Sequence, residues 1–378
     1  MNELRHNIIT RDWVIIATDR AHRPDEFNQQ RAAPADLPPY REDCPFCAGN
    51  EARTGVETAI LSDDRGWRVR AVLNKYPALS PDGEVIRQRG KLYRSLTAVG
   101  VHEVIIEHPC HNVTLALLPL DDISDVLRMY RERYRHLRKD PRISTIVIFK
   151  NHGRGAGTSL EHPHSQIAAT PIVPNQLRLR TQEAIRYFDD WGECIFCRTL
   201  AEELDAGDRI VCQSKHFVAF IPYAALSPFH LWIFPRRHAS SFEDILDHEI
   251  EDLAEILRQV LAKLYVGLNN PDYNYTIRSI PSDEHRTNYF HWYLAVVPRV
   301  SLTAGFELGS GMYINTTLPE ASAEFLRSIS VGEMAPDSNA NSESDSEGNS
   351  RDNSRGNSQG SSRGNPRGDS HGNPRGDR

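Results

Sequence analysis

The feature that most constrains the fold is an arrangement of cysteines and histidines that occurs twice in the chain. One Cys-x-x-Cys unit spans 44–47, and a second begins 150 positions later, at Cys194. Each unit is followed by a short apolar run, a histidine, an amphipathic stretch, and a second apolar run with a further histidine. Two copies of one α+β unit explain this repeated order better than coincidence does. The sequence therefore predicts an α+β fold of two tandem halves, each an antiparallel sheet with packed helices.

Apolar periodicity indicates the same element types in both halves. In the first half the strand-like run 104–107 precedes an amphipathic helix, which we expect from near residue 121 to residue 139. In the second half the run 231–234 precedes a helix expected over about 242–268. Apolar residues recur on one side of each stretch, as expected of helices that pack on a core.

Composition divides the chain into three parts. We expect an N-terminal domain over 1–180, a C-terminal domain over 181–333 and a low-complexity tail over 334–378. From about residue 337 the tail has no large apolar residue and repeats short Arg-Gly-Asn and Arg-Gly-Asp units. Such a segment buries too little surface to offset chain entropy, which predicts disorder. Because acidic residues are interleaved with its arginines, a solvated tail without a catalytic role is favoured over one that binds RNA.

Charge and hydropathy argue against two classes of partner. The 378 residues carry a formal net charge of −7, which provides no global attraction to nucleic acid. No apolar run approaches the roughly 20 residues that span a bilayer, and the N-terminus lacks the apolar core of a signal peptide. We therefore expect no membrane or nucleic-acid partner, and a cytoplasmic location. In that setting a Cys-x-x-Cys unit is typical of a metal or redox site rather than a disulfide.

The first cysteine pair and two histidines form a candidate metal set. Cys44, Cys47, His111 and His162 make a Cys2His2 combination, which matches tetrahedral zinc. Four protein ligands leave no position for water, so this zinc would be structural. Zinc is favoured over a redox dithiol because each cysteine pair is followed by histidines in the same order.

The second cysteine pair has equivalent partners. Cys194, Cys197, His238 and His291 form the second set. His230 is an alternative to His238 as the third ligand, and the sequence is compatible with either. One or two structural zinc ions per chain are therefore expected.

A glycine-rich segment that ends in His162, Pro163, His164 and Gln166 points to phosphate chemistry. Residues two apart on an extended chain point to the same face, so His164 and Gln166 should share one environment. If His162 binds metal, His164 is free, and a neutral imidazole is a good nucleophile near pH 7. Attack on phosphorus would form a covalent phosphoramidate that a second acceptor opens. Gln166 would then donate a hydrogen bond to a phosphate oxygen in the transition state.

Two further clusters suit a phosphorylated substrate. Arg20 and Arg23 place two guanidinium groups near each other, and such groups grip phosphates bidentately. Asn74 and Lys75 follow a strand-like run and offer an amide and an ammonium group. Solvated surface polarity explains this second cluster about equally well.

Five motifs of the chain occur together in one known family. They are Arg20-Ala21-His22-Arg23-Pro24, the first Cys-x-x-Cys unit, Asn74-Lys75-Tyr76-Pro77-Ala78-Leu79, Gly157-x-Ser159 through His162-Pro163-His164-x-Gln166, and Gly305-Phe306-Glu307. With these motifs the chain resembles, over roughly residues 5–330, the galactose-1-phosphate uridylyltransferase family of the histidine-triad superfamily. This resemblance implies two histidine-triad-like halves and a ping-pong reaction, in which UDP-glucose and galactose 1-phosphate give glucose 1-phosphate and UDP-galactose.

The resemblance also implies a role for each matching residue. His164 would carry the uridylyl group while Gln166 stabilises the phosphoryl oxygens. Ser159 would contact the phosphates. The remaining matches are to substrate-holding positions: Asn74 and Arg20 for the nucleotide, and Phe306 and Glu307 for the hexose.

The second cysteine pair departs from the best-known bacterial members of the family, which lack it. Two cysteine pairs are more similar to the branch that includes plant nucleotide-sugar phosphorylases, which implies inorganic phosphate as an alternative acceptor and ADP-glucose as an alternative donor. In the second half Tyr293 takes the position of the nucleophile, so one catalytic histidine per chain is expected. The resemblance also implies nucleotide-sugar and hexose 1-phosphate substrates and a homodimer.

Overall fold

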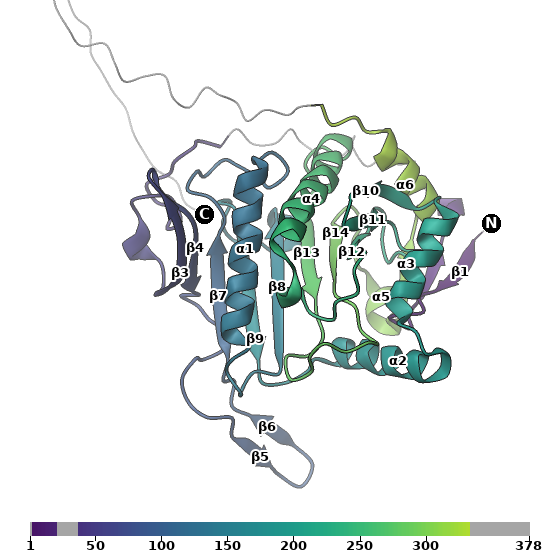
Figure 1. Ribbon diagram of the computed structural model, residues 1–378, viewed down its shortest axis with the longest axis horizontal. Helices are drawn as coiled ribbons and strands as arrows, with labels where there is room; N and C mark the ends of the chain where they lie inside the picture. Colours follow the sequence, from purple (N-terminus) through teal and green to yellow (C-terminus); the bar gives the residue numbers. More distant parts are fainter. Residues whose placement is uncertain (1, 21–36, 333–378) are drawn as a thin grey trace, which may run out of the picture. The chain divides into compact units, whose positions relative to one another are not determined.

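The structure is a computed structural model that describes residues 2–20 and 37–332 (Figure 1). The 3₁₀ turn η1 (Thr18–Arg20) ends the first of these ranges. Arg23 and the tail expected over 334–378 lie outside them, so what we expect of both stays a prediction.

The centre of the protein is a ten-stranded sheet in which every neighbouring pair of strands is antiparallel. Its strand order is β10-β11-β12-β14-β13-β8-β9-β7-β4-β3. The strands of the first half are β3 (Glu57–Asp63), β4 (Gly66–Leu73), β7 (Val101–Ile106), β8 (Thr145–His152) and β9 (His164–Thr170). Those of the second half are β10 (Ile210–Gln213), β11 (Phe217–Phe220), β12 (Leu231–Pro235), β13 (Tyr273–Arg278) and β14 (Tyr293–Pro298).

The strand order confirms the expected duplication and adds one feature to it. Read outward from the middle, β8-β9-β7-β4-β3 on one side repeats as β13-β14-β12-β11-β10 on the other. The two sheets are not separate, because β8 pairs with β13 from His152 opposite Tyr273 to Ile148 opposite Ile277. Each half would otherwise leave one buried strand edge unpaired, and unpaired backbone groups are costly.

Two long helices occupy equivalent places in the two halves. α1 (Leu120–Leu137) connects β7 to β8, and α4 (Asp247–Gly267) connects β12 to β13. The two helices contact each other on one face of the sheet (Figure 1). α1 agrees with the expected range, but α4 begins later than residue 242. The turn η5 (Phe242–Asp244) comes first, and the Glu249 side chain then caps the new helix by accepting a hydrogen bond from the Leu246 amide at 2.9 Å.

The core forms on both faces of the sheet because inward positions alternate along each strand. Ile233 and Leu294 face α1 and α4 and belong to the larger apolar cluster. Trp232, Phe234 and Tyr293 point to the other face and pack with residues of α3 (Ile195–Ala206). The second half therefore buries an aromatic layer on the face opposite α4.

The remaining elements lie around this sheet. The elements are α2 (Asn175–Trp191), α5 (Gly305–Ser310), α6 (Pro319–Ser328), η3 (Glu51–Arg53), η4 (Arg154–Ala156), a sheet of β1 (Glu3–His6), β2 (Trp13–Ile16) and β15 (Tyr313–Asn315), and a hairpin of β5 (Arg87–Arg89) and β6 (Arg94–Leu96).

α2 (Asn175–Trp191) contains the domain boundary that the sequence predicts after residue 180, and the division into domains stays a prediction. Among the described residues, no helix is both long enough and apolar enough to cross a membrane.

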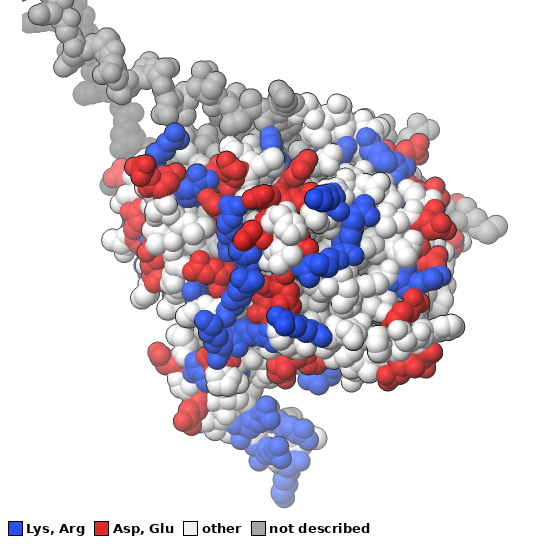
Figure 2. Space-filling model, in the orientation of Figure 1, with Lys and Arg blue, Asp and Glu red and all other residues white. Residues whose placement is uncertain are grey.

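Charge is unevenly spread on the face that α1 and α4 cover. Acidic and basic side chains are interspersed over the two helices, whereas the β5–β6 hairpin is basic (Figure 2). Arg87, Arg89, Lys91 and Arg94 are all exposed there.

Candidate active site and metal sites

The structure brings the first cysteine and histidine set together. The ligand atoms of Cys44, Cys47, His111 and His162 lie within 4.8 Å of one another, and all four residues are buried. The Cys47 sulfur is 3.6 Å from Nδ1 of each histidine. Zinc bonds of about 2.3 Å to sulfur and about 2.0 Å to nitrogen at a tetrahedral angle would separate these atoms by about 3.5 Å. The four side chains therefore fit a zinc ion.

A hydrogen bond fixes the ring state of His162. Its Nε2 lies 2.8 Å from the backbone oxygen of His108. A carbonyl oxygen only accepts, so Nε2 carries the proton and Nδ1 presents its electron pair toward Cys47. Burial lowers the pKa of His162 to about 3, which keeps the ring neutral, as metal binding requires.

The second set has the same geometry. The ligand atoms of Cys194, Cys197, His238 and His291 lie within 4.8 Å of one another, and the Cys197 sulfur is 3.2 Å from Nδ1 of His238 and 3.3 Å from Nδ1 of His291. A hydrogen bond from Cys197 is the largest of the effects that lower the pKa of Cys194 to about 5. A thiolate is the form that binds zinc.

Of the two histidines that the sequence left as alternatives, the structure places His238 in this set. Its Nε2 lies 2.9 Å from the Thr287 backbone oxygen, so the proton is on Nε2 and Nδ1 faces the cysteines. His230 instead accepts a hydrogen bond from the indole of Trp232 at 3.2 Å and stays outside the cluster.

His164 begins β9, directly after the first metal set. Its Nδ1 lies 2.8 Å from the backbone oxygen of His162 and therefore donates its proton there. Burial lowers the pKa of His164, and this effect outweighs the hydrogen bond to His162, which raises it. The imidazole is thus neutral at pH 7, with its electron pair on Nε2.

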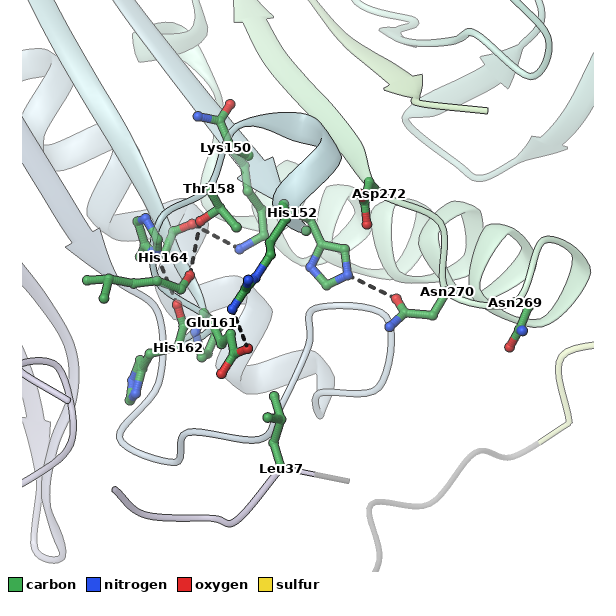
Figure 3. A pocket seen from close by; sticks show the side chains of 15 residues that line it. Leu37, Lys150, His152, Thr158, Glu161, His162, His164, Asn269, Asn270 and Asp272 are labelled. Atoms are coloured by element: carbon green, nitrogen blue, oxygen red, sulfur yellow. Dashed lines mark hydrogen bonds and ion pairs between the residues drawn. The ribbon is translucent and has the colours of Figure 1, made fainter. Parts of the chain in front are cut away.

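His164 lines a cavity of about 290 Å³ (Figure 3). β8 and the loop before β13 form the opposite wall, where Nε2 of His152 lies 2.9 Å from Oδ1 of Asn270. Burial and the nearby Lys150 lower the pKa of His152 to about 4. Lys150 lines the cavity as well, and the other described lining residues are Leu37, Asn151, Gly153, Arg154, Thr158, Leu160, Glu161, His162, Pro163, Asn269 and Asp272.

A buried polar network holds the backbone at His164. The Lys150 ammonium donates to Glu107 at 2.5 Å and to the His164 carbonyl at 3.1 Å, and both charged side chains are almost fully buried. The Tyr130 hydroxyl lies 3.3 Å from Glu107 and 2.6 Å from the Ser165 hydroxyl. Because a buried charge must be paired, these contacts fix the strand that carries His164. This network was not predicted from the sequence, although a lysine at the end of an apolar run was a signal for it.

Gln166 was expected to contact the phosphate and Asn74 the nucleotide. Both side chains lie beside a third residue, His102. Oε1 of Gln166 lies 2.8 Å from Nε2 of His102, and Nδ2 of Asn74 lies 3.3 Å from the same nitrogen. His102 was not identified from the sequence. The pairing of β7 with β9 brings it beside Gln166.

Other expected substrate residues do not line this cavity. Ser159 is exposed in the loop between η4 and β9, although its neighbours Thr158 and Leu160 are lining residues. Phe306 and Glu307 lie in α5, and Glu307 accepts a hydrogen bond from the Ala304 amide at 3.0 Å, which caps that helix. The segment expected to contact the hexose is therefore not among the described residues that line this cavity.

Both halves of the chain match one family. Residues 1–174 match the N-terminal domain of galactose-1-phosphate uridyl transferase, and residues 179–333 match its C-terminal domain. The chain is 36% identical over 334 residues to an ADP-glucose phosphorylase of Arabidopsis thaliana, an alignment that covers 87% of this chain and 93% of the relative. It is 28% identical over 341 residues to a galactose-1-phosphate uridylyltransferase of Thermotoga maritima, covering 88% and 99%.

A solved structure shows the same fold. The crystal structure of an ADP-glucose phosphorylase from Arabidopsis thaliana with bound ADP-glucose superimposes with a TM-score of 0.74 at 33% identity. The superposition covers 88% of this chain and all of that one. Together with the family match over both halves, this places the chain in the galactose-1-phosphate uridyl transferase family, as one of its nucleotidyltransferases.

Proposed function

We propose that this protein moves a nucleotidyl group from a nucleotide sugar to a second acceptor through a covalent bond to Nε2 of His164. One observation carries the proposal. The His162 carbonyl holds the proton on Nδ1, which leaves the electron pair on Nε2 of a neutral ring that lines the cavity. A neutral, oriented imidazole needs no separate base to attack phosphorus.

Both chemical steps balance on this histidine. Nε2 attacks the α-phosphorus of the nucleotide sugar, a nitrogen–phosphorus bond forms, and the bond to the bridging oxygen breaks to release hexose 1-phosphate. An oxygen of the acceptor then attacks the same phosphorus, and the electron pair of the broken nitrogen–phosphorus bond returns to Nε2. The Gln166 amide would donate to the non-bridging oxygens, where charge develops in each step.

The metal sets would support the site without taking part in the chemistry. Each set offers four protein ligands whose geometry fits zinc, so we propose two structural zinc ions per chain. In the first set the zinc would connect the segment that carries Cys44 and Cys47 to His162, two residues before the nucleophile. The site would then depend on metal for its shape.

For the acceptor we favour inorganic phosphate, with ADP-glucose as the donor. The similarity to an ADP-glucose phosphorylase supports this choice. The second cysteine pair also supports it, because in this feature the sequence resembles the phosphorylase branch of the family. The second candidate is uridylyl transfer from UDP-glucose to galactose 1-phosphate, which the family match and the Thermotoga maritima relative favour.

We also propose that the protein acts as a homodimer. Phe306 and Glu307 match the hexose-contacting segment of the family but do not line the cavity at His164 of their own chain. A second copy of the chain would supply this segment.

An acceptor panel tests the proposal. The protein is incubated with ADP-glucose or UDP-glucose, each with inorganic phosphate, galactose 1-phosphate or water, and the mass of the intact chain is measured before acceptor is added. Labelling by ADP-glucose with release of ADP on addition of phosphate supports the phosphorylase. Labelling by UDP-glucose with transfer to galactose 1-phosphate supports the second candidate. Turnover without any nucleotidyl label on the chain would contradict the covalent mechanism.

A further inference from the structure

His102 sits where three parts of the first half meet. It belongs to β7, its Nδ1 lies 3.2 Å from the Ala78 amide nitrogen, and its Nε2 lies 2.8 Å from Oε1 of Gln166. Its backbone oxygen accepts a hydrogen bond from the Asn74 amide at 2.8 Å. The ring is therefore fixed from both sides rather than packed as an ordinary core side chain.

These contacts determine which ring nitrogen carries the proton. A backbone amide only donates, so Nδ1 of His102 accepts from Ala78 and has no proton of its own. In the neutral ring the proton is then on Nε2, which must donate. Its partner on Gln166 must accept, and only the amide oxygen of that side chain does so. The hydrogen-bond network thus assigns the orientation of the Gln166 amide.

The orientation leaves the NH2 group of Gln166 free of His102. His164 and Gln166 are two residues apart on β9 and share one face of the strand. The NH2 group is a double donor and lies on the face that carries the nucleophile. If the amide rotated by half a turn, its oxygen would face the phosphoryl group instead, and two centres of negative charge would meet.

We infer that His102 is a positioning residue, which holds the Gln166 amide with its NH2 group toward the phosphoryl group on His164. This inference rests on the proposed function, because it assigns the part of the site that acts on the transferred group. It explains why a histidine stands at this position. The ring accepts at Nδ1 and donates at Nε2, and it links the 74–79 segment to β9.

Asn74 lies beside the same ring. Its Nδ2 lies 3.3 Å from Nε2 of His102, but a protonated Nε2 cannot accept from it. Its Oδ1 accepts from the Tyr76 amide at 2.9 Å, which fixes the side chain with Nδ2 on the His102 side. Both amides beside His102 thus keep N–H groups available for a ligand.

Three variants test the inference through the rate at which the chain acquires a nucleotidyl label in a single turnover. His102→Gln keeps an N–H group near the position of Nε2 and should label within about threefold of the wild-type rate. His102→Leu has no donor and should label roughly 10- to 100-fold more slowly, because a freely rotating amide loses much of the stabilisation of a developing charge. His102→Asn is too short to reach Gln166 and should resemble His102→Leu.

A double variant separates positioning from a general structural effect. In a Gln166→Ala background, His102→Leu should cause less than a further twofold loss, because the group that His102 orients is already absent. The apparent affinity for the nucleotide sugar should change much less than the rate, because the interaction belongs to the transition state. Thermal unfolding of each variant checks that the fold is retained.

The outcomes distinguish this inference from the proposed function. A wild-type chain that acquires no label overturns the proposed function, and this inference falls with it. If the single variant His102→Leu acquires the label at the wild-type rate while the single variant Gln166→Ala is slowed, this inference alone is overturned. An equal loss from His102→Leu with and without Gln166 also overturns it, since His102 would then act through another group.

Discussion

The two halves of the chain place different residues at equivalent positions beside equivalent metal sets. His164 begins β9 two residues after His162, and Tyr293 begins β14 two residues after His291. His164 lines a cavity together with Lys150, whose ammonium group is paired with Glu107. Tyr293 has 1% of its surface exposed and is surrounded by aromatic rings of α3 and β12. The first half therefore has a histidine that lines a cavity where the second half has an aromatic core.

Two further equivalent residues, Glu107 in the first half and Phe234 in the second, show how the surroundings of His164 and Tyr293 differ. Glu107 lies four residues before His111, and Phe234 lies four residues before His238. Glu107 pairs with Lys150, whereas Phe234 stacks on Trp232 with ring centroids 5.6 Å apart. A buried ion pair is costly to desolvate and is a weak source of stability. We propose that this pair is kept because Lys150 also holds the backbone carbonyl of His164. Both halves have the geometry to bind metal, whereas the position two residues after the last metal-set histidine carries a cavity-lining histidine in the first half and a core tyrosine in the second.

The largest expected effect is on nucleotidyl transfer. His164→Ala should reduce turnover by about 10⁴-fold or more, because the covalent route is lost and only binding remains. Tyr293→Phe is the matched control and should stay within about twofold of wild type, since its ring is enclosed by the core. Turnover and intact mass measure both. A comparable loss from Tyr293→Phe would show that the second half takes part in catalysis.

The next largest effect is expected when either metal set loses a cysteine: both losses should lower stability, and only one should lower activity. Cys47→Ser and Cys197→Ser should each remove one zinc per chain after dialysis and lower the unfolding midpoint, because the metal stabilises only the folded state. Activity should fall by roughly 10-fold or more in Cys47→Ser alone, because His162 positions the residue that reacts. Metal analysis, thermal unfolding and turnover at a permissive temperature give the three readouts. Equal losses of activity would contradict the contrast between the halves.

The smallest effect concerns stability at mildly acidic pH. Burial lowers the pKa of His152 in the first half to about 4 and that of His230 in the second half to about 3. Below pH 6.5 the unfolded chain gains protons that these folded histidines reject, so stability is lost as pH falls from 6.5 toward those values. Each histidine contributes a slope of about 1.4 kcal/mol per pH unit.

Replacing either histidine by glutamine should flatten this slope by that amount. Urea unfolding of His152→Gln and His230→Gln between pH 6.5 and 5 measures the change. Because the halves share one sheet, both substitutions should act on the same single transition. Two transitions, each sensitive to one substitution, would show that the halves unfold independently.

Local patterns allowed much of this architecture to be predicted. Cysteine spacing and the order of histidines identified two sets that the structure brings together, and apolar periodicity located α1 nearly to its ends. The start of α4 was placed too early, because the apolar pattern continues through Leu246 while a hydrogen bond from its amide to Glu249 begins the helix there. Periodicity reports burial and does not reveal where a helix is capped.

What the sequence could not provide are contacts between segments that are far apart. Lys150 and Glu107 are 43 residues apart, and no periodicity joins them. His102 looks like any polar residue in a strand until β7 pairs with β9 and the ring meets Gln166. The pairing of β8 with β13 is equally hidden, since both are ordinary apolar strands. That these residues act as proposed stays a prediction for the experiments above.

The junction of β8 and β13 has a consequence for the ancestry of the chain. β8 and β13 are equivalent strands of the two halves, and their antiparallel pairing relates the halves by a two-fold axis. An isolated half could therefore pair through this same strand edge with a second copy of itself. Two copies of a single-half ancestor would assemble this ten-stranded sheet with two reactive centres. After gene fusion, one of the two centres would no longer be needed, and its residues could be replaced by apolar ones. Tyr293, which is buried among aromatic rings, would be such a replacement. Chains cut between β9 and α2 should accordingly reassociate as complementary fragments.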